Sequence, residues 1–230
     1  MTAIVAALGR RAARDGGRPL ITYYDLGTGS RTELSGRTFA NWVDKTYHLL
    51  VELDVRPGDE VALPLAEAHP GHWVTLALIA GAWQAGAVVV PGASEDAVVS
   101  AVGPEGLSDS ATGTVLACSL HPLGFGFAES LPSGVIDFSI DVRSQPDVHA
   151  EEPVAESATA WRDGPDVLTH ADLAAAHPVP DRILVRPTSP LATLRAGYLS
   201  PLLGGGSAVI VLGDDENAIS RIAAEERVSG

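Results

Sequence analysis

The most apolar stretch of the chain, residues 73–91, predicts a buried helix followed by a buried strand. Apolar side chains recur at helical spacing from Trp73 onward, and Gly86 follows the predicted helix, where a glycine adopts positive φ without steric cost. Residues 87–90 contain no polar side chain, which is typical of a strand covered on both faces of a parallel sheet. Pro91 ends that strand because proline has no N–H to donate to the ladder.

The same pattern recurs near the C-terminus. Residues 191–203 read as a helix, three glycines interrupt the pattern at 204–206, and residues 207–212 form a second apolar strand. Two helix–glycine–strand units predict a layered α/β protein with a mainly parallel sheet flanked by helices. The interior strands of this sheet are expected at 61–65, 87–90, 115–118, 183–186 and 208–212.

The hydrophobic pattern of the rest of the chain predicts further helices and strands, and these divide into two predicted subdomains. Helices are expected at 2–14, at 38–53 with Thr38 as its cap, at 96–102, from Thr169 with Asp172 completing the cap, and at 217–226. Additional strands are expected at 20–24, 31–35 and 60–65. Residues 144–157 are acidic, contain proline and lack a pattern, so they predict a linker or loop between a first α/β subdomain (1–143) and a second, incomplete one (158–230).

Composition and charge exclude several classes of protein. The 46% of hydrophobic residues supports a sizeable core, whereas a net charge of −14 disfavours nucleic acid and anionic membrane surfaces as partners. Cys118 is the only cysteine, which excludes an internal disulfide and fits a reducing cytoplasm. A membrane span over 73–91 is the alternative for that stretch, but Gln84, its internal glycines and the acidic residues that follow it argue against this alternative.

Three blocks of the sequence resemble the start of the AMP-forming adenylate synthetases. The blocks are LSGRTFANW at 34–42, LDVRPGDEVAL at 53–63 and AGAWQAGAVVVP at 80–91. That superfamily contains acyl-CoA synthetases, luciferases and peptide-synthetase adenylation domains, and the chain also resembles short actinobacterial relatives of uncertain function. Weaker likeness continues at 167–170 and 181–185, so it covers most of this chain but only the front part of a full family member.

The resemblance identifies residues 157–166 (SATAWRDGPD) with the family's phosphate-binding loop. It implies a relic nucleotide site at Ser157, Thr159, Arg162 and Gly164, with Arg162 in place of the lysine that offsets phosphate charge. The span has a single glycine, the bulky Trp161 and two carboxylates that repel phosphate. The family's later adenine- and magnesium-binding motif and its lid domain have no counterpart expected before position 230. No catalytic residue and no metal site are therefore predicted.

Other patterns with chemical potential have simpler structural interpretations. The glycines at 204–206 follow a helix and precede a strand, so an αβ turn is favoured over a phosphate loop. His69 and His72 lack a third metal ligand, and surface or capping roles are favoured. His170 and Asp172 form either an acid–base pair or a helix cap, and the cap is favoured. The aromatic residues of the loop at 124–127 are expected either to fill the core or to contact a partner.

These observations predict a truncated, degenerate relative of the AMP-binding enzymes that does not adenylate an acid alone and serves as a binding or interaction module. One alternative is half of an acyl- or carboxylate-activating ligase completed by another chain, and only this alternative requires ATP and magnesium as cofactors. Another alternative is a structural scaffold that binds no nucleotide. We expect a cytoplasmic protein that self-associates or binds a protein partner near the 207–212 strand, without nucleic acid or membrane partners.

Overall fold

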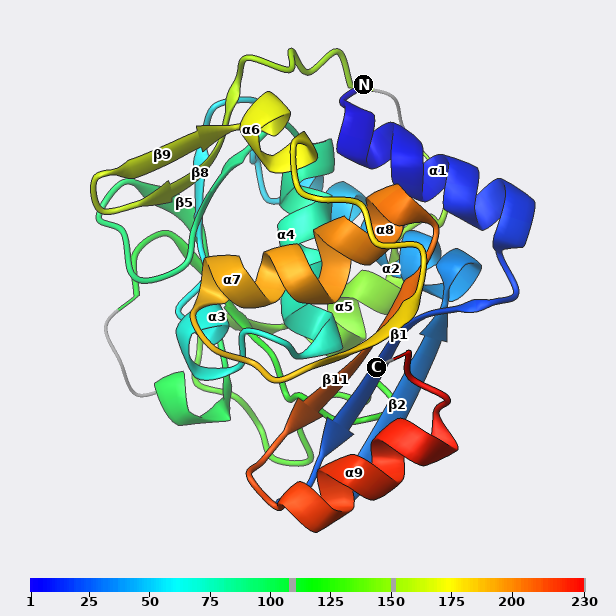
Figure 1. Cartoon of the computed structure of the whole chain (residues 1–230). Helices are drawn as coiled ribbons and strands as arrows, with labels where there is room; N and C mark the ends of the chain where they lie inside the picture. The colour runs from blue at the N-terminus through cyan, green and yellow to red at the C-terminus, as the bar shows by residue number, and fades with distance from the viewer. Residues whose placement is uncertain (108–110, 150–151, 230) are drawn as a thin grey trace.

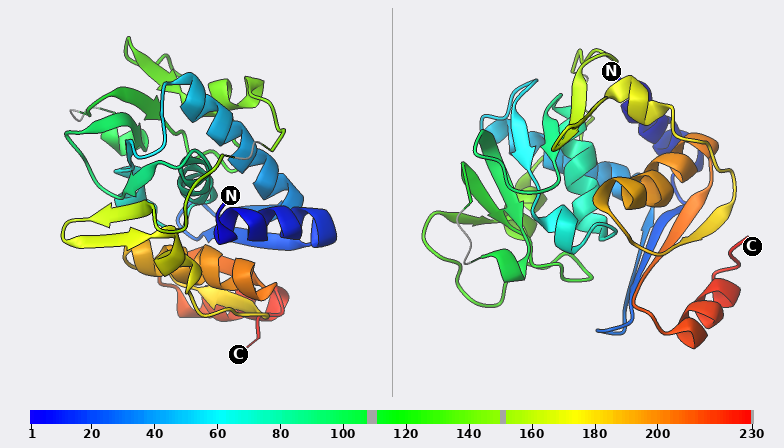
Figure 2. Two further views of the ribbon diagram at one scale, coloured as in Figure 1. Left: turned by 90° about the horizontal axis from the view of Figure 1, so that it is seen from above. Right: turned by 60° about the vertical axis from the view of Figure 1, so that its left-hand side comes forward.

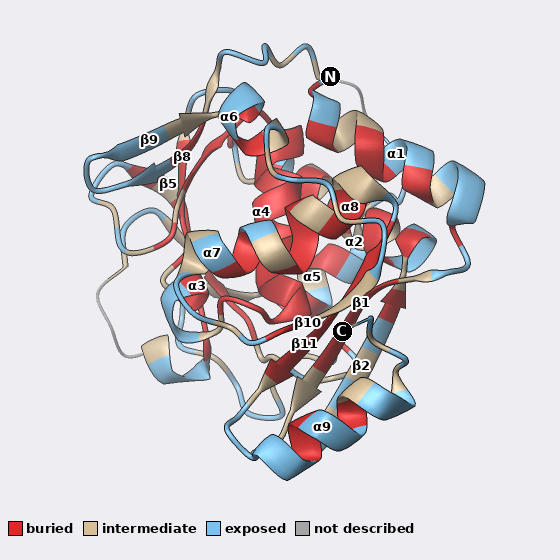
Figure 3. Ribbon diagram, in the orientation of Figure 1, coloured by how far each residue is buried: buried red, intermediate tan, exposed pale blue. Residues whose placement is uncertain are grey.

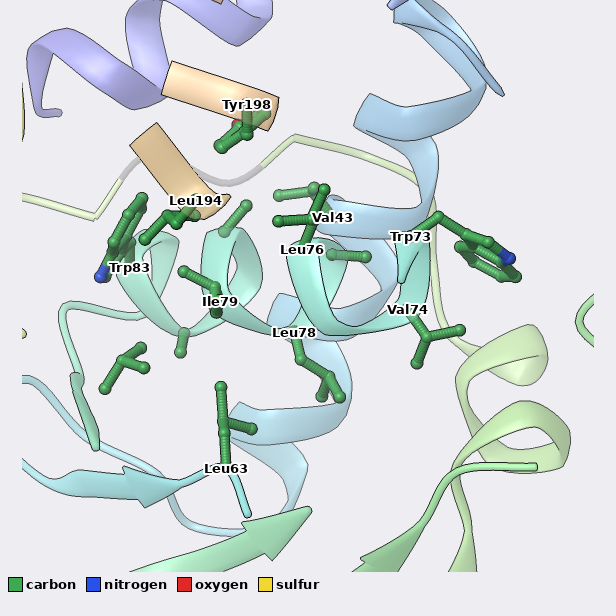
Figure 4. Packing of buried hydrophobic residues seen from close by; sticks show 14 of the residues in the cluster. Val43, Leu63, Trp73, Val74, Leu76, Leu78, Ile79, Trp83, Leu194 and Tyr198 are labelled. Carbon is green, nitrogen blue, oxygen red and sulfur yellow. The ribbon is translucent and has the colours of Figure 1, made fainter. Parts of the chain in front are cut away.

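A fully buried helix, α4 (Trp73–Gln84), lies at the centre of the molecule in the computed structural model, which describes residues 1–107, 111–149 and 152–229 (Figure 1). All 12 of its residues are buried. Leu63, which follows a strand of a seven-stranded sheet, lies on one side of α4, and the helical segment that carries Leu194 and Tyr198 lies on the other (Figure 4). A helix that is apolar on every side can be stable only when other elements surround it, as they do here.

Eleven strands within the described residues form two sheets. The smaller sheet has the order β10-β11-β1-β2, and the larger sheet has the order β7-β6-β5-β3-β4-β8-β9. All pairings are parallel except the two hairpins, β1 with β2 and β8 with β9. The strand bounds are β1 Pro19–Asp25, β2 Ser30–Ser35, β3 Glu60–Ala62, β4 Val88–Val90, β5 Ala97–Val102, β6 Thr114–Ala117, β7 Val135–Asp137, β8 Thr159–Asp163, β9 Asp166–Thr169, β10 Arg182–Val185 and β11 Ser207–Leu212.

Helices fill the space between the sheets and cover the outer face of the smaller one (Figure 2). The helix α9 packs against β11 through Ile219 and Ile222, while the opposite face of β11 joins the main core. The remaining helical bounds are α1 Ala3–Asp15, α2 Gly36–Glu52, α3 Leu65–Ala68, η1 Pro104–Gly106, α5 Phe138–Ser144, α6 His170–Ala174, α7 Pro190–Leu194, the π-helical turn η2 Arg195–Leu199, α8 Ser200–Gly204 and α9 Glu216–Glu225.

Both predicted helix–glycine–strand units are confirmed. Gly86 has φ of 73° and connects α4 to β4, and Gly205 has φ of 82° and precedes β11. The mainly parallel, helix-flanked α/β class is also confirmed. The predicted interior position of the 183–186 strand is wrong, because β10 is an edge strand of a separate, smaller sheet within the described residues.

Several local predictions require correction. The helix expected at 96–102 is wrong, because residues 97–102 form the strand β5, whose small and β-branched side chains are mostly buried between β3 and β6. Ser35, not Thr38, is the N-cap of α2, and its hydroxyl accepts a hydrogen bond from the Thr38 N–H. The strand expected at 60–65 ends at Ala62, and Leu65 begins α3. The pattern did not predict β7, α5, β8 or β9.

The segment 144–157 contains no strand, and only Ser144 belongs to a helix within its described part. It runs along α2, where the Tyr47 hydroxyl donates a hydrogen bond to Glu152 at 2.8 Å and His149 contacts Asp44 at 2.9 Å. Residues 150 and 151 of the predicted linker lie outside the described residues. The subdomain bounds at 143 and 158 stay a prediction, although each sheet combines strands from both sides of this segment.

Buried residues continue from one sheet to the other through the central helices (Figure 3). One cluster joins Val61 and Val89 of the larger sheet to Ile21 and Ile210 of the smaller sheet by way of α4. Among the described residues, no helix combines the length and the apolar composition that crossing a membrane would need.

Candidate functional site

The segment identified with a phosphate loop is a tight β-hairpin. β8 pairs antiparallel with β9 so that Arg162 lies opposite Val167 and Asp163 lies opposite Asp166. Gly164 and Pro165 form the turn, with φ of 55° at Gly164. The ladder uses backbone groups that an open loop would leave free to bind anions, because each strand residue directs its N–H to the partner strand or to the opposite edge.

The structure separates the four predicted site residues. Thr159 and Arg162 line the same pocket of about 380 Å³, which Gly58 also lines. Ser157 is exposed ahead of β8, and Gly164 lies at the exposed tip of the hairpin. Neither of these two residues lines the pocket, and the nucleotide-binding role of the four residues stays a prediction.

Arg162 is held by a buried carboxylate. Its Nη1 donates a hydrogen bond to Oε1 of Glu60, a residue that is only 8% exposed. The second carboxylate oxygen of Glu60 accepts a hydrogen bond from the Ser94 hydroxyl at 2.5 Å. The guanidinium charge is thus offset within the protein, which reduces its attraction for a phosphate. Sequence reasoning missed Glu60, although a carboxylate beginning an apolar strand indicates that a cationic partner is required.

The base of the hairpin is anchored in the core. Trp161 is fully buried, and the indole N–H of Trp83 donates to the carbonyl of Ala160 at 2.8 Å. His170 follows β9, is also fully buried and lies edge-on to Trp83 with 6.3 Å between ring centroids. Neither ring nitrogen of His170 has a hydrogen-bond partner, and burial lowers the pKa of His170 to about 4. The imidazole is therefore uncharged at neutral pH and serves as packing.

The candidate acid–base pair is a helix cap, as favoured from the sequence. Thr169 and Asp172 form a reciprocal capping box at the start of α6, and His170 faces Trp83 instead of Asp172. Hydrogen bonds from Thr169 lower the pKa of Asp172. These contacts assign Asp172 to the structure of the helix terminus.

The two histidines before α4 have separate structural roles. His72 caps α4 by accepting a hydrogen bond from the Val74 N–H at 3.2 Å, and His69 contacts Glu105 at 2.8 Å. Within the described residues, no three His, Cys, Asp or Glu side chains are grouped so that they could hold a metal ion. Burial raises the pKa of Cys118, which favours the protonated thiol over the nucleophilic thiolate.

The only lysine makes its hydrogen bonds to residues outside the hairpin. The Lys45 ammonium donates to the carbonyl of Arg143 at 3.0 Å and to that of Gln145.

In the loop at 124–127, Phe125 is 47% exposed and lies beneath the guanidinium of Arg143, with 4.9 Å from Cζ to the ring centroid. This aromatic residue therefore faces solvent instead of filling the core.

The comparisons with known proteins identify a relative of nearly the same length. No protein-family model matches the chain. The chain is 35% identical over 236 residues to a protein of Mycobacterium tuberculosis described as a TIGR03089 family protein, with 92% of this chain and 90% of the relative covered.

Solved structures share the fold at low sequence identity. The chain resembles an acyl-CoA synthetase of Brucella canis with a TM-score of 0.79 and 16% identity, over 100% of this chain and 46% of that one. It resembles a benzoate CoA ligase of Burkholderia xenovorans with a TM-score of 0.75 and 17% identity, over 99% and 49% of the two chains. The N-terminal domain of FACL13 from M. tuberculosis has a TM-score of 0.71 and 20% identity, with 99% and 62% covered. The chain thus spans about half the length of the Brucella synthetase and of the Burkholderia ligase.

Proposed function

The chain belongs to the TIGR03089 family, and we propose that it is a binding module with the N-terminal fold of an acyl-CoA synthetase that does not itself adenylate an acid. The single observation that carries this proposal is the β8–β9 hairpin, which occupies the segment identified with the phosphate loop. An adenylating site must surround a triphosphate with free N–H groups and positive charge.

The charges of the hairpin support the proposal. Asp163 and Asp166 lie opposite each other beside the turn, so two carboxylates would face any phosphate that approached the tip. Arg162 is the nearest cationic group in the sequence, and it is bonded to Glu60. Repulsion without a free compensating cation lowers the affinity for a triphosphate.

The test is a calorimetric titration of the full chain with ATP, with and without magnesium, into the millimolar range. We expect no saturable binding and no pyrophosphate release with a panel of short, long and aromatic carboxylic acids. The matched variant is Arg162→Ala, with its fold checked by circular dichroism. Magnesium-dependent binding that this variant abolishes would establish a working nucleotide site and support the half-ligase alternative.

We further propose that the smaller sheet mediates self-association, through β10 instead of the interior strand β11. The Ser207 N–H bonds the carbonyl of Asp181, so strand alternation directs the backbone groups of Arg182 and Leu184 away from β11. The Ser229 N–H already donates a hydrogen bond to the outward carbonyl of Arg182 at 2.9 Å. The next outward N–H and C=O along the strand are those of Leu184. The part of the edge that Ser229 leaves uncovered can accept a strand of a second copy.

Light scattering over a wide concentration range tests this association. We expect the mass per particle to rise with concentration, and we expect Leu184→Pro to reduce the rise because proline lacks the outward N–H. Val167→Pro, on the edge strand β9 of the other sheet, is the matched control. A chain that stays monomeric at high concentration would contradict the proposal.

A further inference from the structure

A cavity of about 420 Å³ lies between the two sheets, apart from the hairpin. Tyr23 and Asp25 of β1 form one wall, and Glu105 and Ser119, which follow β5 and β6, form the other. The cavity is thus located at the carboxyl ends of parallel strands from both sheets. Open α/β sheets bind their ligands at such strand ends, especially near the point where the strand order reverses.

The strand order of the larger sheet reverses beside this cavity. The chain passes from β3 to β4 on one side and then returns to β5 on the other side of β3. His69 follows β3 by way of α3, and Glu105 follows β5, so the two residues enclose the carboxyl end of this reversal. His69 Nε2 and Glu105 Oε1 are 2.8 Å apart, which fixes both side chains at the cavity wall.

The part of the cavity lining formed by His72 and Leu120 is rigid. His72 is 4% exposed, bonds the Val74 N–H through Nδ1 and also hydrogen-bonds the backbone of Leu120. Leu120 has φ of 57°, a left-handed conformation that a leucine adopts only when its surroundings impose it. The wall is therefore preorganised before any ligand enters.

Tyr23 supplies the observation that indicates a ligand. Its side chain is 4% exposed and lines the cavity, and its ring lies edge-on to His72 with 4.9 Å between centroids. Within the described residues the Tyr23 hydroxyl makes no hydrogen bond, unlike the hydroxyl of its neighbour Tyr24, which bonds Glu226 at 2.6 Å. The hydroxyl oxygen is not among the fully buried polar atoms, so solvent reaches it through the cavity, and a polar group that enters the cavity can bond to it in place of water.

The charges of the cavity select the sign of that ligand. Asp25 and Glu105 are the carboxylates in its lining, and neither lysine nor arginine lines it. The Asp25 oxygens accept hydrogen bonds from the Gly27 N–H at 2.8 Å and the Thr28 hydroxyl at 2.9 Å, which neutralise none of its charge. Carboxylates beside an aromatic ring favour an ammonium group and repel phosphate and carboxylate ligands.

We propose that this inter-sheet cavity binds a small aliphatic amine in its ammonium form, with the charged nitrogen between the Glu105 carboxylate and the Tyr23 hydroxyl. The remaining carbon chain lies against Leu120 and the prolines at 104 and 122. The volume falls within the range of about 300–1,000 Å³ that is usual for small-molecule sites. The proposal does not depend on whether the hairpin binds a nucleotide.

Calorimetry of the full chain with 1,4-diaminobutane tests the proposal, with 1,4-butanediol and succinate as ligands of similar length and different charge. We expect saturable binding of the diamine only. Tyr23→Phe and Glu105→Gln should each weaken that binding by about tenfold, the loss expected for one hydrogen bond to a charged group. Glu129→Gln removes one carboxylate outside the cavity lining and should leave the affinity unchanged.

Two-dimensional NMR locates the binding, because the amide signals of residues 23–30, 69–72 and 119–122 should shift together. Circular dichroism of each variant checks that the fold is retained. The proposal would be overturned by the absence of saturable diamine binding to the intact protein. It would also be overturned if the diol bound equally well, or if Glu129→Gln weakened binding as much as Glu105→Gln does.

Discussion

A Cβ atom added to Gly81 would lie 2.6 Å from Cγ2 of Thr46, so α4 and α2 approach each other more closely than any other residue at position 81 would allow. We expect Gly81→Ala to lower the free energy of unfolding by about 1 to 3 kcal/mol, because Thr46 and the backbone at Tyr47 must move. Thermal and urea denaturation measure this change.

Gly9→Ala is the matched control for that substitution. Gly9 lies inside α1, and an added Cβ would meet no atom within 4 Å. Alanine should raise stability there by about 0.5 to 1 kcal/mol through its higher helix propensity. Equal effects of the two substitutions would show that the α2–α4 contact is not tight.

Gly86 combines a left-handed backbone with close neighbours. Its φ is 73°, and an added Cβ would lie 3.0 Å from Val154 and 3.2 Å from Pro57. We expect Gly86→Val to lower the melting temperature strongly, because a branched residue is strained at positive φ and would also crowd both neighbours. Gly205→Val, at φ of 82° with open space around it, measures the backbone strain alone. The prediction fails if Gly86→Val has the same melting temperature as the wild type.

Arg162→Ala should destabilise the protein by leaving the Glu60 carboxylate buried without its cation. The expected loss is about 1 to 3 kcal/mol, since the Arg162 side chain is 46% exposed and water can partly replace it. Adding Glu60→Gln to that variant should recover part of the loss. Arg186→Ala removes an ion pair with Glu216, which is 71% exposed, and should change stability by less than about 0.5 kcal/mol. Equal losses for Arg162→Ala and Arg186→Ala would contradict this.

Stability should fall as the pH is lowered below about 6.5, because two buried histidines resist protonation. Burial lowers the pKa of His72 to about 3 and that of His170 to about 4, so the unfolded chain binds these protons first. Each histidine then reduces the free energy of unfolding by up to about 1.4 kcal/mol per pH unit, until the pH reaches its folded pKa.

His170→Phe should make this pH dependence shallower, since phenylalanine has no proton to bind and the His170 ring makes no hydrogen bond that would be lost. Val167→Ala changes an exposed residue that carries no titratable group, so it is the control and should leave the slope between pH 6 and pH 4 as it is in the wild type. Denaturant titrations at several pH values decide between the two outcomes. An unchanged slope in His170→Phe would contradict the assignment of His170 as a buried, neutral group.

Sequence patterns correctly predicted the elements in which nearly every side chain is buried. The helix before Gly86 and the strand after it carry an unbroken apolar pattern, and only one arrangement buries both. Residues 97–102 were mistaken for a helix because their short run of Ala and Val fits both periods. The sheet decided the outcome, since β5 fills the position between β3 and β6.

The candidate site was only partly predictable. The Asp163-Gly164 pair between short β-prone runs is a hairpin signal, so β8 and β9 could have been inferred from local turn chemistry. The salt bridge between Glu60 and Arg162 spans 102 residues of sequence, and no local pattern pairs them. Likewise, Tyr23, His69 and Glu105 are brought together only by the packing of two sheets, which the sequence pattern does not order.

The position of α4 between the sheets links their unfolding. Because α4 is apolar on every side, it has no face that water could cover if either neighbour detached. The helical segment that carries Leu194 and Tyr198 packs on β11 of the smaller sheet and covers one side of α4, whereas Leu63, next to β3 of the larger sheet, covers another (Figure 4). Loss of either sheet would therefore leave one side of α4 without its cover. Neither sheet can therefore melt alone without a large hydrophobic penalty, and the two sheets should unfold in a single cooperative transition.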